Sequence, residues 1–226
     1  MKRSAKSVQI EVGATCVSGL LLSPPTPKAC FVVAHGAGAG MLHPFMTTLA
    51  NDLAARQIAT LRYQFPYMEK RGKRPYPPSV CHATVRAAVA AAHTLLPALP
   101  LIAGGKSFGG RMTSQAQAAN PLPQVRGLAF LGFPLHPPKE PSDQRAEHLS
   151  KVQIPMLFLQ GARDEFAQAS LLNPLIARLG ALATLCVLPD ADHSFHVPAR
   201  STFTAAQTNE RLLSALSEWT DAVIRA

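Results

Sequence analysis

The residues of this chain with the clearest capacity for chemistry surround Ser107. This serine is the centre of Gly105-Lys106-Ser107-Phe108-Gly109, a G-x-S-x-G pattern that follows the apolar run 101–103. A nucleophile on a sharp turn between a strand and a helix needs positions without side chains two residues before and after it, which the two glycines supply. The backbone N–H of Phe108 would then be placed to bind an oxyanion at the positive end of the helix. The pattern predicts an activated serine, although a simple glycine-rich turn also satisfies it.

Two nucleotide-binding motifs share part of this pattern, and both are disfavoured. Gly105-Lys106-Ser107 resembles the end of a phosphate-binding P-loop, but that motif requires a glycine where this chain has Pro100. The residues between them form an apolar strand instead of a loop that could wrap phosphates. Gly36, Gly38 and Gly40 also lack the spacing of the dinucleotide-binding motif G-x-G-x-x-G.

A serine hydroxyl is a weak nucleophile until a histidine removes its proton and a carboxylate orients that histidine. Asp164 follows the apolar run 155–159, and His193 follows the apolar run 184–188. The order Ser, Asp, His along the chain is one of those known for such triads. Each residue lies just beyond the end of its run, where ligands gather in open sheets of parallel strands. The sequence therefore predicts acyl transfer through Ser107, His193 and Asp164.

Both partners of the serine have competitors nearby. Asp164 could be the N-cap of a helix, and Asp190 and Asp192 are reserve acids. The closeness of these two to His193 favours loop-capping roles for them. His196 competes as the base, but Asp-His-Ser-Phe soon after the last strand favours His193 and leaves His196 to line the cleft.

A second oxyanion donor is expected in the glycine-rich turn Gly36–Gly40. The N–H of Ala37 would act there with the N–H of Phe108, because such a turn lets the backbone approach a substrate carbonyl. His35 is expected to be a structural histidine bonded to the backbone, since only one base is needed.

Short apolar runs alternate with amphipathic segments along the whole chain, which predicts an α/β fold with a mostly parallel sheet flanked by helices. The first two runs alternate in period two and form an expected antiparallel edge pair. The expected strands are 7–12, 17–22, 30–34, 59–63, 101–103, 127–131, 155–159 and 184–188. Apolar stripes at helical spacing are Phe45, Leu49 and Leu53; Val85, Val89, Ala92 and Leu96; and Leu212, Leu216, Trp219 and Val223. A single domain over 1–226 is expected.

Two proline-rich segments, 65–79 and 134–150, follow strands and are candidate site loops. The second is too short for a large cap domain. The predicted substrate-lining residues are Tyr67, Met68, Leu135 and Phe195. The run Lys70-Arg71-Gly72-Lys73-Arg74 could attract the carboxylate or phosphate of an anionic ester, although a solvated loop is the simpler interpretation.

The composition narrows the possible partners. The chain is 47% hydrophobic and only 15% charged, which is typical of a packed protein. Its net charge of +9 is not accompanied by the motifs of a nucleic-acid binder, so nucleic acid is not an expected partner. No signal peptide or apolar run of membrane-spanning length is apparent, which predicts a cytoplasmic protein. The four cysteines are expected to be buried free thiols, and no metal site or cofactor is implied. The oligomeric state is left open.

With these residues in hand, the chain resembles the α/β-hydrolases over nearly its full length, and within them the dienelactone-hydrolase-like group. Four segments resemble the testis-expressed protein 30 and NSL-complex subunit 3 hydrolase-like family: His35–Met41, Phe65–Glu69, Gly104–Arg111 and Leu131–Pro137. The resemblance implies a Ser-Asp-His fold without a large lid. Lys106 occupies a position that varies in the superfamily, and its charge either has a structural role or favours an anionic substrate.

These observations predict a carboxylesterase-like serine hydrolase that forms an acyl-enzyme on Ser107 and acts on a small-molecule ester or thioester. The alternative is a non-catalytic interaction module that keeps the same fold, as in some relatives of the resembled family.

Overall fold

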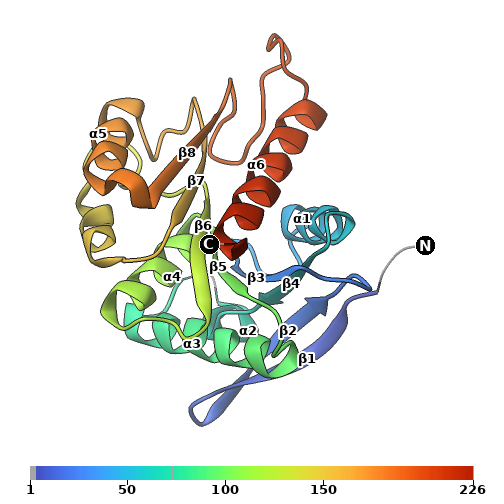
Figure 1. Cartoon of the computed structure of the whole chain (residues 1–226). Coiled ribbons are helices and arrows are strands. Elements are labelled where there is room, and N and C mark those ends of the chain that lie inside the picture. Colours follow the sequence, from blue (N-terminus) through green and yellow to red (C-terminus); the bar gives the residue numbers. More distant parts are fainter. Residues whose placement is uncertain (1–3, 73, 226) are drawn as a thin grey trace.

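The computed structural model describes residues 4–72 and 74–225 and contains an eight-stranded sheet (Figure 1). The strand order is β1-β2-β4-β3-β5-β6-β7-β8. The pairs β1–β2 and β2–β4 are antiparallel, and the other neighbouring strands are parallel. The strands are β1 Lys6–Val12, β2 Thr15–Leu22, β3 Ala29–Ala34, β4 Ile58–Tyr63, β5 Leu101–Lys106, β6 Val125–Leu131, β7 Met156–Gly161 and β8 Ala183–Leu188. All eight predicted runs are strands, and the antiparallel edge pair is confirmed.

Helices cover both faces of the sheet. Alternate residues of β3 point to opposite faces: Cys30 and Val32 pack into one apolar core, and Phe31 and Val33 into the other. The first core is covered by α3 (Pro78–Leu95), α4 (Phe108–Ala119) and α5 (Ala169–Leu179), and the second by α1 (Pro44–Ala55) and α6 (Ala205–Arg225) (Figure 1). The short helix α2 (Pro66–Glu69) and the 3-10 helices η1 (Gln144–Lys151) and η2 (Gly180–Leu182) complete the elements. Both faces of the central strands are therefore covered, which explains their continuous apolar sequence.

The three predicted apolar stripes lie on α1, α3 and α6, and Trp219 packs into the second core as a structural residue. Leu96 lies one residue beyond the end of α3. The strand β5 is longer than predicted, because it continues through Gly104 and Gly105 to Lys106. A side chain at position 104 would place its Cβ 1.9 Å from the carbonyl oxygen of Ala129 on β6, so the glycine permits this close strand pairing.

Within residues 4–72 and 74–225, no large cap domain covers the carboxyl edge of the sheet. The segment between β6 and β7 contains only the short helix η1, as its length predicted. Among the described residues, no helix has the length and hydropathy needed to cross a membrane. All four cysteines are free, but the prediction of burial is wrong for Cys16, which is exposed near the start of β2, and Cys186 is only half-buried.

Candidate active site

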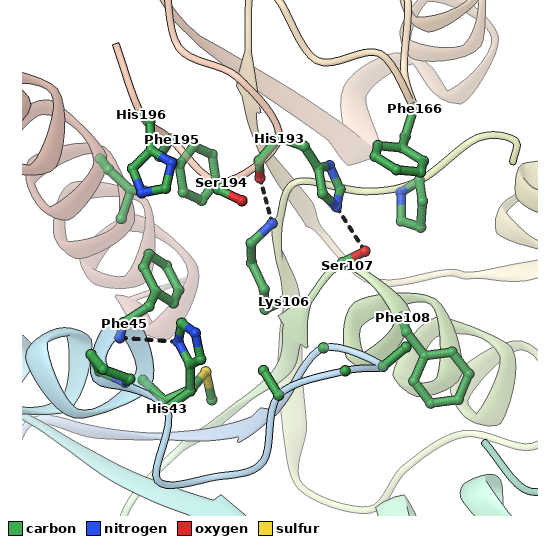
Figure 2. A pocket seen from close by; sticks show the side chains of 18 of the residues that line it. His43, Phe45, Lys106, Ser107, Phe108, Phe166, His193, Ser194, Phe195 and His196 are labelled. Carbon is green, nitrogen blue, oxygen red and sulfur yellow. Dashed lines mark hydrogen bonds between the residues drawn. The ribbon is translucent and has the colours of Figure 1, made fainter. Parts of the chain in front are cut away.

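Ser107, His193 and Asp164 lie in one hydrogen-bonded row at the carboxyl edge of the sheet. The Nε2 atom of His193 is 2.8 Å from Ser107 Oγ (Figure 2), and its Nδ1 atom is 2.7 Å from Asp164 Oδ2. Ser107 follows β5, Asp164 follows β7 and His193 follows β8. Because the carboxyl ends of parallel strands meet at one edge, three loops distant in sequence converge there. The structure therefore brings together the three residues that the sequence predicted as partners.

The turn that carries Ser107 is strained and depends on its flanking glycines. Ser107 has a φ of 50°, a left-handed conformation that is costly for a residue with a side chain. Its backbone N–H donates to the carbonyl of Leu131, which holds the turn against β6. A Cβ at Gly105 would lie 2.4 Å from the carbonyl oxygen of Ala34, and one at Gly109 would lie 2.5 Å from that of His35. The backbone approach at both positions excludes a side chain.

We expect Gly109→Ala to lower the free energy of unfolding by about 1 to 3 kcal/mol, because the added methyl group must push α4 away from β3. Gly38→Ala is the matched control: nothing lies within 4 Å of a Cβ built there, and the change should be less than about 1 kcal/mol. Urea denaturation of both variants measures the difference. Equal stability of the two variants would contradict the steric argument.

Asp164 is held as an acceptor for the histidine by its own loop. Its side chain is buried, and its Oδ1 atom accepts the N–H of Phe166 at 2.9 Å. Its Oδ2 atom accepts a short hydrogen bond from Gln160, whose side-chain oxygen in turn accepts the N–H of Phe133. This network fixes the orientation of the carboxylate toward His193.

The competing residues have other partners. Asp192 Oδ1 accepts the N–H groups of Ser194 and His196, and Asp190 Oδ2 accepts the hydroxyl of Ser201, so both acids hold the loop as predicted. His196 is exposed and lines the pocket beside the row of three.

His35 is a structural histidine bonded to the backbone, as expected. Its Nδ1 atom lies 2.7 Å from the carbonyl oxygen of Gly36, and its Nε2 atom accepts the N–H of Phe65. Because Nε2 accepts this hydrogen bond, the proton of the neutral ring lies on Nδ1. Burial lowers the pKa of His35 and so favours the neutral form. The neutral ring ties the glycine-rich turn to the segment after β4.

Lys106 has a structural contact that its sequence position did not reveal. Its Nζ atom donates to the carbonyl oxygen of His193 at 2.5 Å and lies 5.1 Å from the centre of the Phe195 ring (Figure 2). Burial lowers the pKa of Lys106 to about 8, and the carboxylates of Asp164 and Asp192 partly oppose this shift. The side chain thus ties the end of β5 to the loop that carries the histidine.

This shift makes the contribution of Lys106 to stability depend on pH. Between pH 8 and 10.5 the amine is protonated in the unfolded chain but neutral in the folded protein, so unfolding takes up a proton. Raising the pH through this window should therefore increase the stability of the wild type relative to Lys106→Met, which lacks the titrating group. Urea denaturation of both proteins at pH 7, 8.5 and 10 measures this difference. A difference that stays constant with pH would contradict the shift.

A pocket of about 840 Å³ opens beside Ser107 and His193. One side contains the apolar side chains of Phe45, Phe195 and Leu212 beside His43 and His196, and the rings of Phe45 and Phe195 lie 5.8 Å apart (Figure 2). The opposite side contains Phe108 and Phe166, and the Phe166 ring lies 4.5 Å from that of His193 (Figure 2). If a bond of a substrate were held at Ser107, the two groups that it joins would therefore contact different surfaces of the pocket.

Of the four predicted substrate-lining residues, only Phe195 lines this pocket. Tyr67 is buried and donates its hydroxyl to the carbonyl of Ala37, so it supports the turn from beneath. Met68 packs against the core, and Leu135 is fully buried beside a neighbouring pocket. The prediction is therefore wrong for these three, because loop residues adjacent to a site turned their apolar side chains inward.

The described part of the basic run, residues 70–72 and 74, is likewise absent from the pocket lining, and Lys73 lies outside the described residues. Instead, Lys106, Arg111 and Arg145 line the pocket. Arg111 could have been found in the sequence, because it lies one helical turn after Ser107 and so on the same side of α4. Arg145 could not, since its place depends on how the segment before β7 folds back.

The predicted oxyanion donors are in suitable places. Ala37 and Phe108 both line the pocket next to Ser107. Phe108 is the first residue of α4, and the first N–H groups of a helix have no acceptor within the helix. In the described part of the chain, neither backbone N–H donates to a carbonyl in a turn or loop. Both groups are therefore available to an oxygen atom above Ser107.

Comparison with solved structures shows the same fold over the whole chain. A dienelactone hydrolase from Anabaena variabilis is 18% identical, with a TM-score of 0.73 over 100% of this chain and 98% of that one. A serine hydrolase without a lid from Xanthomonas campestris is 19% identical, with a TM-score of 0.74 over 97% and 96%. Est1E from Butyrivibrio proteoclasticus is 15% identical, with a TM-score of 0.71 over 97% and 99%.

The family comparison agrees with this fold and covers most of the chain. The model of a family described as an alpha/beta hydrolase domain matches residues 27–221, a range that includes β3 to β8 and the row of Ser107, Asp164 and His193. The chain belongs to this α/β-hydrolase domain family.

Proposed function

We propose that this protein is a serine hydrolase of the carboxylesterase type, which cleaves ester or thioester bonds through an acyl-enzyme on Ser107. The observation that carries the proposal is the unbroken row from Ser107 Oγ through His193 to Asp164, with distances of 2.8 and 2.7 Å, at the wall of an open pocket. Hydrogen-bonded nucleophile, base and orienting acid are the arrangement that nucleophilic catalysis requires.

In the proposed reaction, Ser107 Oγ attacks the substrate carbonyl while His193 Nε2 accepts its proton. Asp164 accepts the Nδ1–H of His193, which keeps Nε2 free for that proton and stabilises the imidazolium. The N–H groups of Ala37 and Phe108 stabilise the oxyanion. The imidazolium then protonates the leaving group, and a water molecule activated by the same histidine releases the acyl group from Ser107.

The substrate class follows from the pocket and from similar proteins. Without a large cap domain, the pocket can admit esters of modest or variable size. The solved structures with this fold include a dienelactone hydrolase and an esterase domain from Rhodothermus marinus, which favours ester bonds among the acyl substrates. The narrower kinship with the testis-expressed protein 30 and NSL-complex subunit 3 family rests on four sequence segments and remains a prediction.

The test is covalent labelling with a fluorophosphonate, read by intact mass. The wild type should gain one probe mass per chain, because only an activated serine attacks phosphorus rapidly. Ser107→Ala should gain none, and His193→Ala should label far more slowly. Failure of the wild type to react would overturn the proposal and favour a non-catalytic module that keeps the fold.

A further inference from the structure

The charged residues on the pocket wall are all of one sign. Among the described residues that line it, Lys106, Arg111 and Arg145 carry positive charges, and none is an aspartate or glutamate. Lys106 is already bonded to the carbonyl of His193. The two guanidinium groups are therefore the charges left to meet a ligand.

Arg111 reaches the wall from the helix of the nucleophile. Its backbone N–H donates to the carbonyl of Ser107, which places it one turn along α4, and its guanidinium lies 5.7 Å from the centre of the Phe108 ring. Its Nε atom is buried and has no hydrogen-bond partner in the described chain. An unsatisfied buried donor of this kind is costly, and a bound acceptor would satisfy it.

Arg145 lies on η1, which packs against α4, the helix that carries Arg111. Burial first, and next the positive charge of Arg145, lower the pKa of Arg111, and both side chains line the pocket. In the described parts of the chain, no carboxylate lies within 4 Å of either group. Such unneutralised like charges repel each other until an anion lies between them.

The half-buried histidines near Arg111 add little positive charge to this side of the pocket. Burial, and then the charge of Arg111, lower the pKa of His148 to about 4, so this ring is neutral at pH 7. Burial also lowers the pKa of His82, and the positive charge of Arg111 lowers it further. The field on this side of the pocket therefore comes from the two guanidinium groups.

We propose that Arg111 and Arg145 bind a carboxylate or phosphate group of the substrate while its scissile carbonyl lies at Ser107. The substrate would then be an anionic ester, with an apolar group against Phe45 and Phe195 on the opposite side of the pocket. Guanidinium groups suit this role because their planar donors match two oxygens of such an anion. The inference rests on the proposed hydrolase function. It assigns the attraction of an anionic ester to the pocket wall, whereas the sequence suggested the run 70–74 for this role.

The experiment compares matched esters that differ only in charge. In the first pair, the mono(p-nitrophenyl) ester of adipic acid carries its charge on the acyl group, and its methyl ester is the neutral counterpart. In the second pair, p-acetoxybenzoate carries its charge on the leaving group, and its methyl ester is the neutral counterpart. After correction for alkaline hydrolysis rates, wild-type kcat/KM should favour the anionic member of at least one pair by roughly tenfold. Arg111→Met and Arg145→Met should each remove most of this preference and leave the neutral esters within about threefold of wild type.

Arg126→Met is the matched control, since Arg126 is exposed at the amino end of β6 and its loss changes the net charge equally. The Arg126→Met variant should keep the preference for the anionic esters.

Two results would overturn the inference: equal turnover of charged and neutral esters by the wild type, or equal losses on both kinds of ester in Arg111→Met. Hydrolysis of the neutral esters would still show whether Ser107 is a working nucleophile. Benzoate and adipate binding, measured by calorimetry, gives a readout without catalysis. Binding by the wild type that is unchanged in both arginine variants would also overturn it.

Discussion

Ser107→Ala and His193→Ala are each expected to lower kcat/KM for p-nitrophenyl butyrate by at least about a thousandfold, and the double variant by no more than either alone. The two side chains are joined by a 2.8 Å hydrogen bond and would act as one unit: the serine cannot attack without the base, and the base has no proton to accept without the serine. Hydrolysis rates of the three variants, corrected for the uncatalysed reaction, test this expectation.

His196→Ala is the contrasting variant for this prediction. His196 lines the same pocket three residues later, but it is exposed and lies 3.7 Å from Asp192, away from the row that contains Asp164. Its removal should change the rate by less than about fivefold, since the proton acceptor for Ser107 remains in place. A loss in His196→Ala as large as that in His193→Ala would contradict the assignment of the base, and additive losses in the double variant would show that Ser107 and His193 act separately.

Asp164→Asn should lower kcat by about a thousandfold to ten-thousandfold while the protein keeps its fold. The asparagine amide would donate toward His193 Nδ1, where the carboxylate accepts at 2.7 Å. The imidazole would then carry its proton on Nε2, facing Ser107, and could not accept the serine proton. Stopped-flow hydrolysis with circular dichroism of the same samples separates a loss of chemistry from a loss of structure.

Asp192→Asn serves as the matched control for Asp164→Asn. Asp192 caps the loop through Oδ1, an acceptor that asparagine retains, so the rate should fall by less than about tenfold. If Asp192→Asn were the more damaging change, the orienting acid would have to be reassigned to the loop of His193.

The fold was predictable because the signals that specify it are local. A buried strand such as β3 must be apolar at consecutive positions, whichever strands become its neighbours. The stripes on α1, α3 and α6 follow from the period of the helix alone. The end of β5 was misplaced because two glycines favour a turn by local preference, and only the close approach of β6 keeps Gly104 in the strand.

The sequence by itself determined the order of Ser107, Asp164 and His193, the glycines that their turn requires, and the position of each residue after a strand. Only the tertiary structure decided what surrounds them. It turned Tyr67 and Leu135 into the interior, bonded Lys106 to the loop of His193, and placed Arg145 beside Arg111 in the pocket. The reason is physical: a turn or a strand depends on residues adjacent in the chain, whereas a pocket wall depends on how separate loops pack against each other once the sheet has brought them to one edge.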